Sequence, residues 1–150
     1  CRILIMGSKN FLSKEEQSMV VKAIELAELN TSGEIRVHIE STCNLDPIER
    51  AIFVFNKIGM NKTQERNGVL IYIAWKSHKF AIIGDEGINN VVSDDFWDKE
   101  RYILLSYLKE NKPGEGLCEA IRMIGENLKE FFPYQKDDIN EQSNEISFGE

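Results

Sequence analysis

The stretch "NGVLIYIAWKSHKFAIIGDEGIN", residues 67–89, decides the fold of this chain. Residues 69–75 form a continuous apolar run, and such runs are typical of a strand that is covered on both faces in an α/β sheet. Residues 76–78 then turn the chain into a second apolar run, residues 79–84. The stretch therefore predicts two strands joined as an antiparallel hairpin.

The residues before this hairpin predict a third strand and a connecting helix. Residues 34–40 alternate between polar and apolar side chains, which is typical of a strand with one buried face. "LDPIERAIFVFNKIG", residues 45–59, predicts a helix, with Asp46 at the N-cap position and Pro47 at the first helical position. This strand, this helix and the strand 69–75 together predict a right-handed βαβ crossover.

Apolar residues at helical spacing predict three further helices. The first lies in residues 12–33, where Ser13 and Glu16 have the spacing of a capping box. The second begins near Ser93 or Asp94, and the third follows the interruption "PGEGL" and continues to the last proline. These elements predict an α/β fold, a three-layer α/β/α sandwich with a small mixed sheet.

The sequence divides into three segments. Residues 1–10 are interpreted as a leader or as a segment introduced by cloning, and they carry no fold prediction. Residues 11–133 form the predicted α/β/α domain. Residues 134–150 are acidic, polar and without periodicity, so they predict a disordered tail.

The composition limits the partners and the compartment. The chain has 150 residues and a net charge of −7, which fits one soluble globular domain and argues against nucleic acid as a partner. No stretch approaches the roughly 20 apolar residues that cross a bilayer. The three cysteines have no metal-binding spacing and their number is odd, so a reduced, cytoplasmic location is the expectation. We expect a monomer, and an envelope association if the native N-terminus precedes this sequence.

Acidic residues gather after the hairpin, and they are the candidate metal ligands. They are Asp85, Glu86, Asp94, Asp95 and Asp98. Calcium takes six to eight oxygen ligands, which closely spaced carboxylates and loop carbonyls supply, and Gly84 and Gly87 would let the backbone turn its carbonyls inward. The alternative is that Ser93, Asp94 and Asp95 form only a helix N-cap and its first-turn acids. Asp85 and Glu86 have no such structural explanation.

The start of the second strand should lie beside these acids across the hairpin. Arg66 and Asn67 would then position a ligand, or they would form a turn that hydrogen-bonds the opposite loop. This corner lies opposite the carboxyl ends of the parallel strands, where open α/β sheets usually bind ligands. The sequence has no HExxH helix, no GxSxG turn and no P-loop. It therefore does not indicate a zinc metalloprotease, an α/β-hydrolase or a P-loop nucleotide-binding protein.

Several motifs, taken in order, resemble the TPM domain family. They are "TSGEIRVHIE", "RNGVLIYIA", "KFAIIGDEGIN", "FWD" and "GEGLCEAIRMIGENLKEFFP", and the resemblance covers residues 11–133. It implies an α/β/α sandwich and binding of divalent cations, calcium included, with acid-phosphatase activity attributed to plant members. Most bacterial members have no known function. By position, the resemblance assigns the metal role to the five acids named above.

Three functions follow as hypotheses. The first is a domain that binds a divalent cation, Ca²⁺ or Mg²⁺, at the acidic corner. The second is a metal-dependent acid phosphatase that acts on phosphate monoesters, in which the cation activates water and Arg66 steadies the phosphate. The third is a noncatalytic module that binds a protein partner. No nucleophile is identifiable in the sequence, so the catalytic residues and the substrate stay unassigned.

Overall fold

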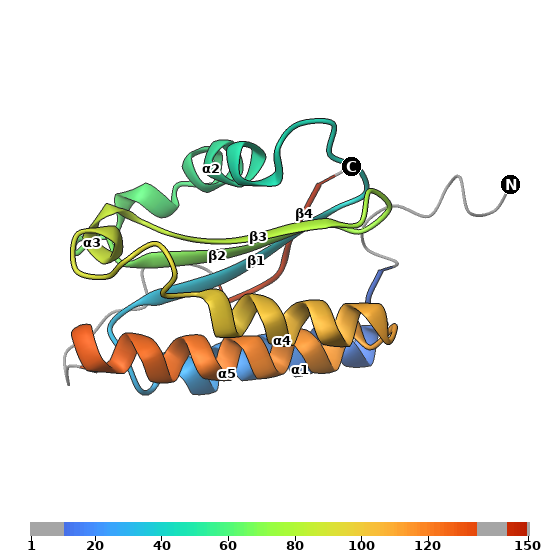
Figure 1. Cartoon of the computed structure of the whole chain (residues 1–150). Helices are drawn as coiled ribbons and strands as arrows, with labels where there is room; N and C mark the ends of the chain where they lie inside the picture. Colours follow the sequence, from blue (N-terminus) through green and yellow to red (C-terminus); the bar gives the residue numbers. More distant parts are fainter. Residues whose placement is uncertain (1–10, 135–143, 150) are drawn as a thin grey trace, which may run out of the picture.

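The computed structural model describes residues 11–134 and 144–149, and it has the predicted fold (Figure 1). The predicted leader, residues 1–10, lies outside the described residues. No helix in the described part of the chain is long and apolar enough to cross a membrane. The elements in chain order are α1 (Lys14–Glu28), β1 (Glu34–Glu40), α2 (Pro47–Lys57), the 3₁₀ helix η3 (Met60–Lys62), β2 (Gly68–Ala74), β3 (Lys79–Gly84), α3 (Glu86–Asn89), α4 (Asp98–Lys109), α5 (Pro113–Phe131) and β4 (Ser147–Phe148).

The sheet has four strands in the order β3-β2-β1-β4. Strand β1 runs parallel to β2, with Glu34 opposite Gly68 and Glu40 opposite Ala74, and α2 connects the two. Strands β2 and β3 pair antiparallel through a short turn. The predicted βαβ unit and the predicted hairpin are therefore both confirmed.

Helices cover the sheet on both faces. Helices α1, α4 and α5 lie on one face and α2 lies on the other, so the molecule is a three-layer sandwich (Figure 1). Every residue of the central strand β2 is buried, as its continuous apolar run predicts. The side chains of β2 alternate between two cores, with Ile71 on the face of α1, α4 and α5 and Tyr72 on the face of α2.

Local sequence signals define two helix ends. The capping box of α1 is present, since the Ser13 hydroxyl accepts from the Glu16 amide at 3.0 Å and the Glu16 carboxylate accepts from the Ser13 amide at 2.9 Å. Such a cap stabilises a helix by about 1 kcal/mol. Helix α2 ends before Gly59, whose φ of +82° is a left-handed conformation that favours glycine.

The segment "PGEGL" does not interrupt the helices as predicted but forms the first turn of α5, which begins at Pro113. Its glycines are needed for close packing. A Cβ added at Gly116 would lie 2.6 Å from the Cβ of Tyr107 on α4, and one added at Gly114 would lie 2.7 Å from a carboxylate oxygen of Glu16 on α1. The glycines therefore let α5 approach both neighbouring helices.

The prediction of a disordered tail does not hold for residues 144–149. Two of them form β4, which pairs in parallel with β1 at the edge of the sheet. Ile146 and Phe148 are partly buried against the main core, and these contacts add to the strand pairing. Two apolar residues give too short a pattern to reveal a strand. The rest of the predicted tail, apart from residue 134, lies outside the described residues.

Candidate functional site

An ion pair joins the acidic loop to the start of β2. The Arg66 guanidinium donates from Nε and Nη2 to the two carboxylate oxygens of Asp85, at 2.7 and 2.9 Å, and from Nη1 to Glu86 at 3.0 Å. The side chain of Asp85 is buried, whereas that of Glu86 is exposed. The structure thus brings Arg66 to two of the predicted site acids. The hydrogen bonds that Arg66 donates to Asp85 raise the pKa of this arginine above its ordinary value.

Asp85 also has a structural role that the sequence did not reveal. It is the N-cap of the short helix α3, and its side chain accepts from the Glu86 amide at 2.8 Å. Its own amide donates to the carbonyl of Gly68 on β2 at 2.9 Å. The expectation that Asp85 lacks a structural explanation is therefore wrong, because one carboxylate both caps a helix and receives an arginine.

The backbone packs so closely around residue 87 that only glycine fits there. A Cβ added there would lie 2.2 Å from the carbonyl oxygen of Glu65 and 2.5 Å from that of Arg66. Neither Gly84 nor Gly87 has a positive φ, so neither supplies the special backbone conformation that the sequence suggested. Arg66 does have one, with a φ of +52°, and such a conformation is strained for a residue with a Cβ.

Asn67 points away from the acids. Its side-chain amide donates to the hydroxyl of Ser32 at 3.3 Å, and that hydroxyl donates to the carboxylate of Glu65 at 3.0 Å. The Gly87 amide donates to the Arg66 carbonyl at 2.9 Å, so the turn does hydrogen-bond the opposite loop. Asn67 thus anchors the turn to the start of β1, and Arg66 alone of the pair reaches the acidic loop.

The remaining site acids lie on and after an exposed turn. Helix α4 begins at Asp98 with Trp97 as its N-cap, so the prediction of a start near Ser93 or Asp94 is wrong, and residues 94–97 form a turn. Asp94 and Asp95 therefore do not cap α4. The Ser93 hydroxyl donates to the Asp95 carboxylate, and Arg101 donates to Asp98 at 2.8 Å.

The described residues contain no preassembled metal site. Nowhere in residues 11–134 and 144–149 do three or more His, Cys, Asp or Glu side chains gather closely enough to hold a metal ion. The acidic loop follows β3, which runs antiparallel to β2. The corner therefore lies at the opposite end of the sheet from the carboxyl ends of β1 and β2, as the sequence predicts.

A second polar cluster, which sequence reasoning missed, lies at the carboxyl end of β1. Glu40 is buried and accepts from Arg50 at 2.7 and 2.9 Å, from the Tyr72 hydroxyl, and from His38 Nε2 at 3.2 Å. The alternation of β1 placed His38 and Glu40 on one face, but no spacing in the sequence connects them to Arg50 on α2 or to Tyr72 on β2. Only the packing of α2 onto the sheet brings the four side chains together.

The pKa values in this cluster are shifted by burial and by its hydrogen bonds. Burial by itself would raise the pKa of Glu40, but the hydrogen bonds from Arg50, Tyr72 and His38 hold it at about 2. Burial raises the pKa of Tyr72, and its bond to Glu40 adds to this. Burial lowers the pKa of His38 although Glu40 opposes the shift. Both oxygens of Glu40 are engaged, so the cluster ties α2 to the sheet and leaves this carboxylate no free site for a substrate.

Comparisons with known proteins agree with this structure. The family model of the TPM domain matches residues 5–127. The NMR structure of the BA42 protein from the psychrophilic bacterium Bizionia argentinensis is similar, with 48% sequence identity and a TM-score of 0.87, over 93% of this chain and 96% of that chain. A search of curated proteins gives no match. On the family match, the chain belongs to the TPM domain family.

Proposed function

We propose that this TPM domain binds a divalent cation, Ca²⁺ or Mg²⁺, at the acidic loop of residues 84–98. The observation that supports this most is the position of Asp94 and Asp95, two adjacent exposed carboxylates on a turn, where they cap no helix. Asp94 makes no hydrogen bond or ion pair to any described residue. Its carboxylate is therefore free to act as a ligand.

The ligand candidates differ in how strongly the protein already engages them. Asp94, Asp95, Asp98 and Glu86 are exposed, whereas Asp85 is buried and bonded to Arg66. Since three ligands are not gathered in advance, the cation would draw the loop together and keep several waters. We expect a dissociation constant of about 10⁻⁴–10⁻³ M, as in weak calcium modules.

A noncatalytic role for the cation fits the corner better than phosphatase chemistry. The phosphatase hypothesis needs Arg66 to donate hydrogen bonds to a phosphate. Its Nε, Nη1 and Nη2 atoms already donate to Asp85 and Glu86. One N–H on Nη1 and one on Nη2 are left for a phosphate, and a phosphate at this place would meet the negative charge of the neighbouring acids.

An amide-resolved NMR titration of the chelator-treated chain with Ca²⁺, and then with Mg²⁺, tests the proposal. We expect chemical-shift changes confined to residues 84–98 and 66–68. Asp94→Asn removes one ligand charge with little change of shape and should weaken binding at least about tenfold, which corresponds to 1.4 kcal/mol. Glu110→Gln, at the C-cap of α4, makes the same change of charge and should leave the affinity unchanged.

Two results would contradict the proposal. The first is a titration without shift changes at millimolar cation. The second is an equal loss of affinity in Asp94→Asn and Glu110→Gln, which would indicate a general response to net charge.

A further inference from the structure

The edge of β1 holds residues of the C-terminal segment 144–149 as a short added strand. His38 lies opposite Ser147 and Ile39 lies opposite Phe148, in parallel register. The Gly149 amide donates to the carbonyl of Ile39 at 2.8 Å. Strand addition of this kind is a common way for proteins to bind an extended peptide.

On one face of the segment, side chains of β1 contact its residues directly and limit which residues fit. The His38 ring nitrogen Nδ1 hydrogen-bonds the Ser147 hydroxyl at 2.9 Å. A Cβ added at Gly149 would lie 2.8 Å from Oε1 of Glu40 and 3.0 Å from Nε2 of His38, so only glycine fits without displacement. Because Glu40 is held by Arg50 and Tyr72, it has little freedom to move away.

Glu145, near the start of the segment, carries a charge opposite to that of Arg36 on β1. Burial lowers the pKa of Arg36, and the negative charge of Glu145 opposes that shift. Arg36 lies two residues before His38 on β1, as Glu145 lies two residues before Ser147. The register pairs His38 with Ser147, and continued by two residues in each direction it brings Glu145 near Arg36 and Gly149 near Glu40.

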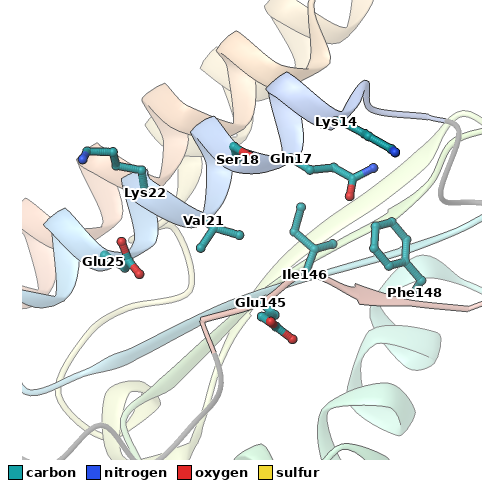
Figure 2. Close-up of a pocket in the computed structure, with 9 residues that line it drawn as sticks. All are labelled: Lys14, Gln17, Ser18, Val21, Lys22, Glu25, Glu145, Ile146 and Phe148. Atoms are coloured by element: carbon teal, nitrogen blue, oxygen red, sulfur yellow. The ribbon is translucent and has the colours of Figure 1, made fainter.

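The other face of the segment is apolar and contacts the core. Ile146 and Phe148 pack against the main core cluster, beside a groove of about 690 Å³ between α1 and the segment. Figure 2 shows Ile146 on the side of Val21 of α1 and Glu145 pointing away from that helix. The groove shows that the segment leaves space along α1 unfilled.

Few contacts hold residues 144–149 to the rest of their own chain. Only two residues of the segment form the ladder, and none of residues 144–149 is buried. Residues 135–143 connect the segment to the end of α5, and a chain of that length reaches at most roughly 30 Å when extended. A strand that is held by so few contacts on such a tether can exchange with an identical strand at low cost.

We propose that the edge of β1 is a strand-acceptor site, selective for the alternating pattern of residues 145–149, and that its occupant in trans is the same segment from a second copy of this chain. The selectivity comes from His38, Glu40 and Arg36 on one face and from the apolar contacts on the other. The inference does not depend on cation binding, because the acceptor edge and the acidic loop share no residue.

A peptide titration of a full-chain variant tests the acceptor site. Gly149→Val weakens the segment of the same chain through the contact with Glu40, and a peptide of residues 144–149, "NEISFG", is then added. We expect the amide signals of His38 and Ile39 to shift on binding. A control peptide with valine as its last residue should bind at least about tenfold more weakly. Equal binding of the two peptides, or no binding of either, overturns the site.

An isotope-mixing experiment with the wild-type chain tests whether a second copy supplies the strand. It does not depend on Gly149→Val. One copy is labelled with ¹³C and the other is unlabelled, and we expect intermolecular contacts between His38 of one copy and Phe148 of the other, together with a dimer fraction that rises with concentration. Peptide binding without such contacts would overturn the second copy as the occupant.

Discussion

Arg66 binds both carboxylate oxygens of Asp85, with donor–acceptor distances of 2.7 and 2.9 Å. This pair ties the turn before β2 to the end of β3, and Asp85 caps α3 at the same time. An arginine that is held in this way is a resident cation of the acidic corner. A divalent cation that approaches Asp85 or Glu86 must therefore overcome its positive charge.

Arg66→Gln should strengthen the binding of Ca²⁺ to the acidic loop. The substitution removes the resident positive charge and frees the carboxylates of Asp85 and Glu86 as ligands. We expect the dissociation constant to fall at least about threefold, as followed by NMR titration at low ionic strength. Arg122→Gln on α5 makes the same change of net charge and should alter the affinity less. An unchanged or weaker affinity in Arg66→Gln would show that the arginine does not compete with the cation.

Gly87→Ala should destabilise the fold much more than Gly84→Ala. The added methyl group at residue 87 meets two backbone carbonyl oxygens, at 2.2 and 2.5 Å, and backbone cannot yield without moving the turn. At residue 84 the nearest atoms to it belong to the side chain of Ile88, at 3.2 Å and beyond. We expect a loss of about 2–3 kcal/mol in the free energy of unfolding for the first and less than about 1 kcal/mol for the second. Urea denaturation of both variants measures the difference, and similar losses would be inconsistent with the close approach.

Glu28→Gln should stabilise the protein at alkaline pH. Burial raises the pKa of Glu28 from 4.5 to about 8, although its carboxylate accepts from the Ile35 amide. The folded state then binds a proton more tightly than the unfolded state, so stability is lost as the pH rises from about 4.5 to about 8. Glutamine stays neutral and still accepts from Ile35, and at pH 9 we expect a gain of at least about 1 kcal/mol.

The pH dependence of urea denaturation checks the role of Glu28. The wild-type curve should fall between pH 5 and pH 8, and the Glu28→Gln curve should fall less. Glu15→Gln, on the exposed first turn of the same helix, is the control and should keep the wild-type slope. A Glu28→Gln variant that is less stable at every pH would mean that the charged carboxylate is needed.

Glu40→Gln should destabilise the protein by about 3 kcal/mol at pH 7, because Arg50 loses a buried carboxylate that it holds with two hydrogen bonds. The depressed pKa of Glu40, about 2, means that its contribution is present above pH 4.5 and is lost as the pH falls toward 2. The gap between wild type and variant should therefore narrow in acid. Tyr72→Phe removes one donor and should cost about 1–2 kcal/mol. A constant gap at all pH values would contradict the charged role of Glu40.

The sequence was sufficient for features that depend on neighbours along the chain. The capping box of Ser13 and Glu16 and the left-handed Gly59 are local, because their hydrogen bonds and backbone angles lie within one turn. The continuous apolar run of β2 predicted its burial on both faces for a similar reason, since a strand of that composition must be covered.

Only the tertiary structure decided the roles of the polar side chains. The carboxylate of Asp85 is bound by an arginine 19 residues away, and Glu40 is held by Tyr72, 32 residues away. The predicted hairpin placed Arg66 beside the acidic loop, but no sequence pattern shows which carboxylate this arginine binds or connects Glu40 to Tyr72, because such partners meet only when separate elements pack. The edge strand β4 is a similar case, since its few residues become a strand only beside β1. The sequence by itself thus determined the layers of the sandwich, while packing across the sheet decided which acids are structural and which are free.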